Sequence, residues 1–380
     1  MHCLILTLVM KTYRLSLLLI IFAFAFASSA LATPSSLFVP ARYSDEVAVI
    51  ETSVNQVITQ IPVGVGAYPI RITMTLDRLK AFVSDNLTAS ISVLDTVALT
   101  NIATIPVQRR PGTSAITPNG TQLWVVHQVG LEGHTSHSPV EVIDTATNLI
   151  ITTVLIPGQG AKDILFTLDG RFAYIANNTL GEVDVIDTTT YQVTSIPTAE
   201  GSRRLAISPA GDRVYVTNNH GTPGSVSVID TATQQVITTI PVGAAPFDVG
   251  VTPNNNEVYV TNQGDMTASV IDTTTLTVIA TIPTGILSQQ LVITPDGTKV
   301  FVANGFSDTV SVINTATHTV IATIHVVHKP WTIGLSPDNM KLYVCGGHDT
   351  RISVIDVASL TVSATIVNVG SGPWDLGFGP

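Results

Sequence analysis

The sequence predicts an all-β protein, specifically a β-propeller of eight four-stranded antiparallel blades. Three observations predict it. A Val-Ile-Asp-Thr block recurs along the chain, a Tyr-Val-Thr-Asn block recurs between its copies, and charged residues make up only 12% of a chain rich in strand-forming residues. Four-stranded repeats of roughly 40 residues are typical of propeller blades. Seven blades, with an irregular first copy, is the alternative.

The two recurring blocks set the length of the repeat. The first ends, at intervals of 42 to 49 residues, at Glu51, Asp95, Asp144, Asp187, Asp230, Asp272, Asn314 and Asp356. The aromatic residue of the second falls at Phe38, Phe82, Trp124, Tyr174, Tyr215, Tyr259, Phe301 and Tyr343. Each block alternates apolar and polar residues between turn residues, which indicates β-strands. We expect the repeated Asp to cap the turn that follows it.

Two further blocks complete the repeat and order its four strands, which we name a to d. Strand a precedes a turn such as 294–297, b is the Tyr-Val-Thr-Asn block, c is the Val-Ile-Asp block, and d is a block such as 237–243. The turn slot that favours a positive φ holds Gly or Asn in six copies and Arg78 in another. Six d blocks carry a proline, which cannot donate to a sheet ladder, so d is expected at the outer edge and a at the centre.

The chain starts and stops within one repeat. Residues 37–39 match strand b, whereas residues 373–380 match strand a. The C-terminal segment is therefore expected to supply the inner strand of the N-terminal blade and so close the ring.

Residues 1–32 have the composition of a secretory signal. Lys11 and Arg14 precede an apolar run over 15–27, and residues 30–32 form a small-x-small cleavage site. A membrane anchor is the alternative, although spanning a bilayer takes about 20 apolar residues. We expect residues 33–380 to form a single propeller domain without a membrane span, secreted to a periplasm or to the cell surface.

Charge and cysteine content narrow the choice of partner. The chain has 17 basic and 27 acidic residues, and loss of Lys11 and Arg14 leaves a net charge of −12. This acidity argues against nucleic acid, which requires a basic surface. Cys345 is the only cysteine beyond the predicted cleavage site, so no intrachain disulfide is expected.

The segments 215–218 and 259–262, which are both Tyr-Val-Thr-Asn and are both followed by Val-Ile-Asp-Thr, resemble the YVTN-family β-propeller repeat. The resemblance covers about residues 35–380 and is strongest in copies five to seven. It implies the propeller fold. Similar repeats occur in archaeal and bacterial surface-layer and exported proteins, and related propellers occur as lactonase-like enzymes and in respiratory metalloenzymes, so the resemblance does not imply one activity.

Because strand direction alternates within a blade, the d–a and b–c loops share one face, and sequence variation concentrates on it. The b–c loop of copy three is seven residues longer than usual. It brings together His127, His134 and His137, which could bind a divalent metal such as zinc or copper. A flexible polar loop without metal is the alternative. No other cofactor site is identified.

A second cluster is expected on the same face, where the last copy meets the first. His328 and Trp331 lie in the d–a connection that enters copy eight, and His348 lies in its b–c loop. Trp374 lies in the connection that enters copy one. These side chains could stack on a sugar or an aromatic ligand. The alternative is that both tryptophans pack between blades near the axis.

A third group is a ring at the start of the inner strands. Equivalent positions hold Arg71, Thr113, Asp163, Arg204, Asp248, Gln290, Thr332 and Asp375. We expect this ring to line the mouth of the central channel. Its carboxylates could hold a cation, or Arg–Asp pairs could join neighbouring blades.

The motifs favour a binding protein over an enzyme. The sequence contains no nucleophile elbow, haem-attachment motif or phosphate-binding loop. We therefore expect an exported, non-catalytic scaffold that binds a protein or polysaccharide at the cell envelope through its d–a/b–c face. The alternative is a lactonase-like or metal-dependent hydrolase or lyase that uses the same face. The oligomeric state stays open.

Overall fold

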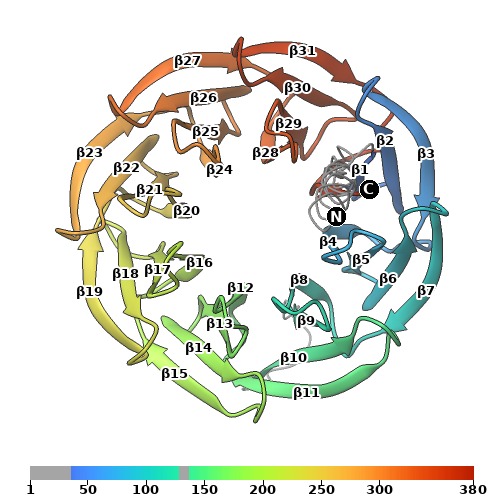
Figure 1. Cartoon of the computed structure of the whole chain (residues 1–380), viewed down its shortest axis with the longest axis horizontal. Coiled ribbons are helices and arrows are strands. Elements are labelled where there is room, and N and C mark those ends of the chain that lie inside the picture. The colour runs from blue at the N-terminus through green and yellow to red at the C-terminus, as the bar shows by residue number, and fades with distance from the viewer. Residues whose placement is uncertain (1–35, 128–136) are drawn as a thin grey trace, which may run out of the picture. The chain divides into compact units, whose positions relative to one another are not determined.

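The computed structural model describes residues 36–127 and 137–380, and every regular element among them is a β-strand (Figure 1). The strands form eight four-stranded antiparallel sheets, arranged as the blades of a ring. The prediction of an eight-bladed propeller is confirmed, and the seven-bladed alternative is wrong. No described residue lies in a helix that could cross a membrane.

Blades are numbered in chain order from the one that contains β1, and strands are given from inner to outer. Blades one to four comprise β32 (Gly377–Phe378), β1 (Ser36–Ala41), β2 (Glu46–Glu51) and β3 (Gln56–Pro62); β4 (Pro69–Met74), β5 (Lys80–Asp85), β6 (Ser90–Asp95) and β7 (Thr100–Pro106); β8 (Pro111–Ile116), β9 (Gln122–His127), β10 (His137–Asp144) and β11 (Ile150–Pro157); β12 (Ala161–Phe166), β13 (Phe172–Asn177), β14 (Glu182–Asp187) and β15 (Val193–Pro197). Blades five to eight comprise β16 (Ser202–Ile207), β17 (Arg213–Asn218), β18 (Ser225–Asp230) and β19 (Gln235–Pro241); β20 (Pro246–Val251), β21 (Glu257–Asn262), β22 (Thr267–Asp272) and β23 (Thr277–Pro283); β24 (Ser288–Ile293), β25 (Lys299–Asn304), β26 (Thr309–Asn314) and β27 (Thr319–His325); β28 (Pro330–Leu335), β29 (Lys341–Gly346), β30 (Ile352–Asp356) and β31 (Thr361–Ile366).

The core lies between blades rather than within them. The repeated aromatic residue of each b strand is fully buried, and it packs against the neighbouring blade. Trp124 of blade three, for example, meets Phe166 of blade four edge-to-face, with ring centroids 5.6 Å apart. Since each apolar face is covered only by the next blade, the ring gains its stability from closure.

The c–d turns are built as the sequence predicts. Asp95 Oδ1 accepts hydrogen bonds from the backbone N–H groups of Val97 and Ala98, at 2.9 and 2.7 Å. Equivalent caps are made by Asp144, Asp187, Asp230, Asp272, Asn314 and Asp356. The repeated carboxylate is therefore a structural cap in these copies.

Arg78 occupies the left-handed a–b turn slot, with φ 62°, where six other blades hold Gly or Asn. A side chain other than Gly costs about 1–2 kcal/mol in this conformation. We expect Arg78→Gly to raise the free energy of unfolding by about 0.5–1 kcal/mol, because glycine's extra entropy in the unfolded chain offsets part of the gain. Urea unfolding would measure this change. Gly297→Ala, in the same slot of blade seven with φ 69°, should move the midpoint the other way; a lower midpoint for Arg78→Gly would contradict the argument.

The C-terminal segment closes the ring, as predicted. Phe378 pairs with Leu37 and Gly377 with Phe38, so β32 is the inner strand of blade one. The regular strand is shorter than the predicted segment 373–380. The segment is irregular at Trp374. The Trp374 N–H donates to Pro40 O, and the Trp374 carbonyl accepts from Thr332 Oγ1 of blade eight.

A buried polar pair joins strands b and c where they approach the d–a/b–c face. In blades six and seven, Asn262 and Asn304 donate from Nδ2 to serine Oγ atoms of strand c, at 2.8 and 2.9 Å. Blade two holds Asp85 in the asparagine position, fully buried, and Ser92 Oγ donates to it at 2.7 Å. Burial raises the pKa of Asp85 to about 7, against the opposing effect of the serine hydrogen bonds.

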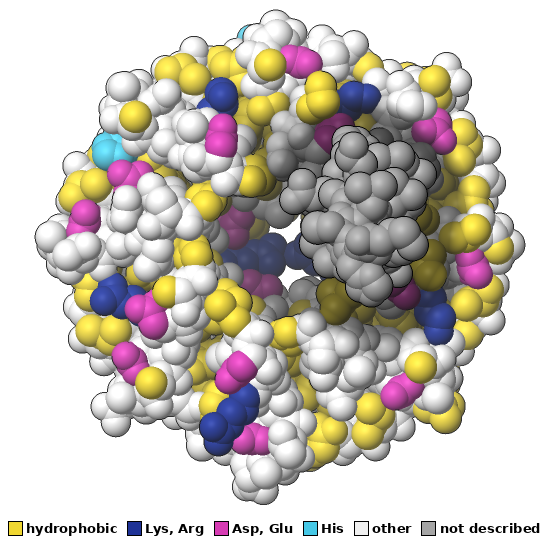
Figure 2. All heavy atoms as spheres, viewed as in Figure 1, with side chains coloured by type: hydrophobic (Ala, Val, Ile, Leu, Met, Phe, Trp, Pro, Cys, Tyr) yellow, Lys and Arg dark blue, Asp and Glu magenta, His cyan; other side chains and the backbone are white. Residues whose placement is uncertain are grey.

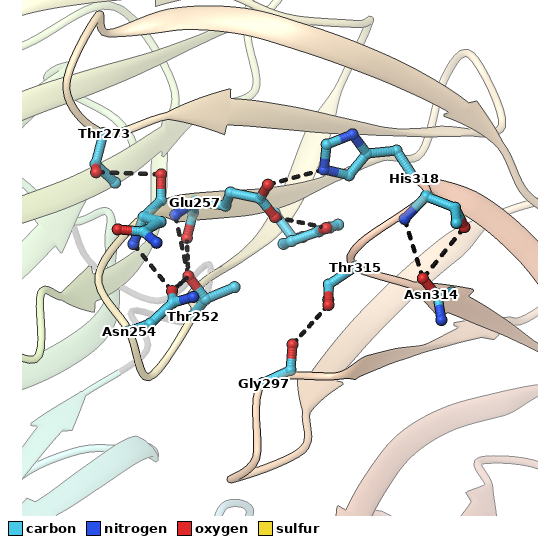
Figure 3. Close-up of polar contacts among 11 residues, drawn as sticks. Thr252, Asn254, Glu257, Thr273, Gly297, Asn314, Thr315 and His318 are labelled. Atoms are coloured by element: carbon cyan, nitrogen blue, oxygen red, sulfur yellow. Dashed lines mark hydrogen bonds and ion pairs between the residues drawn. The ribbon is translucent and has the colours of Figure 1, made fainter.

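On the opposite face, strand b of one blade contacts the c–d turn of the next (Figure 3). His318 Nε2 of blade seven donates to Glu257 Oε1 of blade six at 2.8 Å, and Tyr259 OH donates to the other carboxylate oxygen at 2.9 Å. Lys80 Nζ and Lys341 Nζ likewise donate to carbonyls of the following blade. The regular sequence of this face thus reflects contacts that hold the blades together.

Candidate functional site

The inner strands line a central channel, and a cavity of about 200 Å³ opens at its end on the d–a/b–c face. Figure 2 looks along the channel, and charged side chains are visible within the opening. All eight blades contribute to the cavity lining, which consists of Ile70, Arg71, Gly112, Lys162, Arg203, Arg204, Phe247, Gln289, Gln290, Trp331, Thr332 and Trp374. The lining contains four cationic side chains and no carboxylate.

The predicted Arg–Asp pairs are present in the ring of inner-strand residues. Arg71 lies 3.6 Å from Asp375, and Arg204 lies 3.5 Å from Asp163. In both pairs the second carboxylate oxygen accepts the backbone N–H of the next blade, from Ile72 at 3.0 Å and from Leu205 at 3.1 Å. These carboxylates therefore join neighbouring blades.

Two further members of the ring make the same backbone contact. Asp248 Oδ2 accepts from Leu291 N, and Gln290 Oε1 accepts from Ile333 N, both at 3.0 Å. Burial raises the pKa of Asp248, and Arg204 partly opposes this effect. Asp163, Asp248 and Asp375 thus join neighbouring blades, as one of the two interpretations of the ring expects. None of the three lines the cavity.

Lys162 and Arg203 precede these ring positions by one residue and also face the cavity. The Arg203 guanidinium lies 4.1 Å from the centroid of the Phe247 ring. Burial and the adjacent charge of Arg204 together lower the pKa of Arg203 to about 10. Neither cation was predicted as a site residue, because the predicted ring lies one residue later along each strand.

The two predicted tryptophans meet at the cavity. The rings of Trp331 and Trp374 have centroids 5.1 Å apart and an interplanar angle of 31°. The Arg42 guanidinium lies 4.0 Å from the Trp374 centroid and 4.5 Å from that of Tyr68. The tryptophans therefore pack between blades and also line the mouth of the cavity, whereas stacking of a ligand on them stays a prediction. Arg42 and Tyr68 were not predicted as site residues. Arg42 lies in the b–c loop of blade one and Tyr68 lies in the d–a connection that enters blade two, whereas the predicted cluster was drawn from copy eight and the connection into copy one.

The histidines of this cluster lie away from the cavity lining. His328 Nδ1 donates to Asp308 Oδ2 at 3.0 Å, and both side chains are exposed. His348 lies beside Tyr43, with ring centroids 6.2 Å apart. Burial, followed by the nearby cations Lys329 and Arg42, lowers the pKa of His348. Neither histidine thus lines the cavity, although Gly347, the neighbour of His348 in the chain, lies against both tryptophans.

The proposed metal ligands are only partly described. His134 lies outside the described residues, and His137 is the first residue of β10. His127 is fully buried, with Nδ1 3.0 Å from Arg109 O and Nε2 2.8 Å from Glu141 Oε2. A metal at His127 would have to displace one of these oxygens. Within residues 36–127 and 137–380, no group of three His, Cys, Asp or Glu side chains is arranged to hold a metal ion.

Comparison with known proteins agrees with this architecture. The sequence model of the YNCE-like beta-propeller family matches residues 251–376, which is less than half of the chain. The chain is a β-propeller protein. No curated protein sequence matches it.

Three solved structures are similar to this propeller in fold. Dihydro-heme d1 dehydrogenase NirN in complex with DHE has a TM-score of 0.73 and 13% identity, over 91% of this chain and 75% of that one. Kuenenia stuttgartiensis hydrazine synthase has a TM-score of 0.63 and 20% identity, over 78% and 97%. A functionally unknown protein from Desulfotomaculum acetoxidans DSM 771 has a TM-score of 0.58 and 17% identity, over 91% and 99%. At such identities the likeness establishes the fold alone.

Proposed function

We propose that this propeller is an exported, non-catalytic scaffold that binds a cell-envelope polysaccharide or protein at the axial cavity of its d–a/b–c face. One observation carries the proposal: all eight blades contribute residues to a single cavity on the face where the sequence departs most from its repeat. Rigid scaffolds commonly place binding residues on such loops.

The chemistry of the lining also supports binding. Aromatic side chains supply apolar area, and a few convergent polar groups supply orientation, which is the usual composition of ligand sites. The blades that carry the lining are joined by backbone N–H groups that donate to Asp163, Asp248, Gln290 and Asp375, so the cavity is held in shape before a ligand arrives. The NirN structure, whose title names a complex with DHE, provides a precedent for ligand binding by a chain that contains this fold.

The proposal is tested by capture of envelope polysaccharides and surface proteins on immobilised protein. We expect Trp331→Ala to lower capture about tenfold or more, because it removes aromatic area from the cavity. Thr274→Ala, an exposed change in a c–d turn on the opposite face, serves as the matched control and should leave capture unchanged. Melting temperatures of both variants separate loss of binding from loss of folding. Equal capture by the two folded variants would contradict the proposed site.

A further inference from the structure

The cavity has two chemically different walls. Lys162 and Arg203 come from blades four and five, whereas Trp331 and Trp374 come from blades eight and one. In the ring, blades four and five lie across the axis from blades eight and one (Figure 1). A ligand at the axis would therefore meet Lys162 and Arg203 on one side and both tryptophans on the other, with Arg71 of blade two and Phe247 of blade six also in the lining.

The charge of the cationic wall is only partly compensated, because Asp248 and Asp163 act on Arg203 without forming an ion pair with it and Arg204 opposes them. Among the described residues, neither Lys162 nor Arg203 takes part in an ion pair. The nearby carboxylates of Asp163 and Asp248 accept backbone N–H groups between blades. This excess of positive charge is local, since the whole chain has a net charge of −10. A bound anion would relieve the repulsion between neighbouring cations.

Several buried polar atoms of the lining have no hydrogen-bond partner within the described part of the chain. They are Gln289 Oε1, Gln289 Nε2, Arg203 Nε and Trp331 Nε1. Gln289 is only 1% exposed, so leaving both its amide atoms unpaired is costly unless a ligand or water pairs with them. Because these atoms are covered, the Gln289 side chain has to turn toward the cavity before its amide, which is both donor and acceptor, can pair with a ligand hydroxyl group.

The size of the cavity limits what it accepts. Sites for drug-sized ligands enclose roughly 300–1,000 Å³. This cavity, at about 200 Å³, is smaller and suits one sugar ring. Tryptophan supplies an apolar surface for the face of such a ring, while the opposite wall supplies cations for an acidic substituent.

We infer that the cavity binds an acidic sugar unit, a single pyranose ring bearing one carboxylate or phosphate group, with its ring face toward Trp331 and its anionic group toward Lys162 and Arg203. This inference rests on the proposed function and specifies its ligand. A hexuronate unit of a polysaccharide and a phosphorylated sugar share this chemistry. An acidic peptide is less suited, since it offers no polar ring to place between the aromatic wall and Gln289.

The test is titration of the full chain with small sugars, followed by calorimetry and tryptophan fluorescence. The probes are glucuronate, galacturonate, glucose 6-phosphate and the neutral sugars glucose and galactose. Of the three tryptophans, Trp124 is buried in the core of blade three, so a ligand-dependent emission change would report on the other two. We expect the acidic sugars to bind about tenfold or more tightly than their neutral counterparts, and to lose affinity as salt rises. The ratio between uronates and the sugar phosphate identifies the anionic group.

Charge-removing variants locate the site. Lys162→Gln and Arg203→Gln should each weaken binding of the acidic sugars about tenfold and leave neutral sugars unchanged. Arg171→Gln removes the same charge from an exposed a–b turn and should have no effect. A glutamate-rich peptide is titrated as a further probe. Equal binding of acidic and neutral sugars, tighter binding of this peptide, or equal losses in all three variants would overturn the inference. If envelope capture still depends on Trp331 in that case, the proposed function stands and only its ligand class is wrong.

Discussion

Deletion of residues 373–380 should open the ring and lower the melting temperature by about 10 °C or more. The segment carries Leu376 and Phe378 into the cluster between blades eight and one, where Phe378 meets Tyr343 edge-to-face. It also carries Asp375, which pairs with Arg71 of blade two. Leu376 and Phe378 are partly buried, so loss of each apolar side chain costs up to about 1.5–3 kcal/mol, before the exposed edge of β1 is counted.

A circular permutant is the sharpest control for this deletion. In blade seven the inner strand runs into its neighbour through the turn 294–298. Joining Pro380 to Ser36 through Asp-Gly-Thr, and opening the chain between Gly370 and Ser371, would give blade one the same connection. Melting followed by circular dichroism should show the permutant close to the parent protein and the deletion far below it. A deletion that melts like the parent would contradict closure by β32.

Asp85→Asn should stabilise the protein at pH 8 and have little effect at pH 4. Burial raises the pKa of Asp85 to about 7 from an ordinary value of 3.8, because the carboxylate is removed from water and Asp45 adds repulsion. The folded state then keeps a proton that the unfolded state releases. Stability from this group is present below the unfolded pKa and is lost as pH rises through about 7. The gap between the two pKa values corresponds to about 4 kcal/mol.

Asparagine suits this position because the equivalent residues of blades four to seven are Asn177, Asn218, Asn262 and Asn304. Its amide can donate to Ser90 and Ser92, which now donate to Asp85. The measurement is urea unfolding of both proteins between pH 4 and pH 9. Glu200→Gln, which removes a charge from an exposed residue, is the control. Parallel stability curves for the parent and Asp85→Asn would show that Asp85 is not the group that titrates.

The sequence predicted those features that depend on neighbours along the chain. Asp95 and its equivalents cap turns two and three residues ahead, and Pro62 ends an outer strand because it cannot donate to a ladder. Repetition strengthened each local signal, since eight similar copies had to share one structure. The closing strand followed from the same register, because residues 373–380 match the only strand type missing from the first copy.

The candidate site was predicted only in part, for a physical reason. Trp331 and Trp374 stood out because they interrupt the repeat, and Arg71 and Asp375 stood out because they share a register. Arg203 and Gln289 did not stand out, since each is an ordinary polar residue at the start of a strand. Their importance comes from convergence with residues about 80 to 170 positions away, and from burial without partners. The buried pair of His127 and Glu141 was missed for a similar reason, because a long insertion separates its members.

By itself the sequence determined the blade and the way in which the ends join, and it favoured eight blades over seven, because hydrogen-bonded turns and alternating strands are local and were repeated eight times. The tertiary structure alone decided which side chains meet at the axis. Closing the ring places the first residues of eight inner strands around one opening. It thereby sets cations from blades four and five against aromatic rings from blades eight and one. That arrangement depends on the angle between blades, which no single repeat encodes.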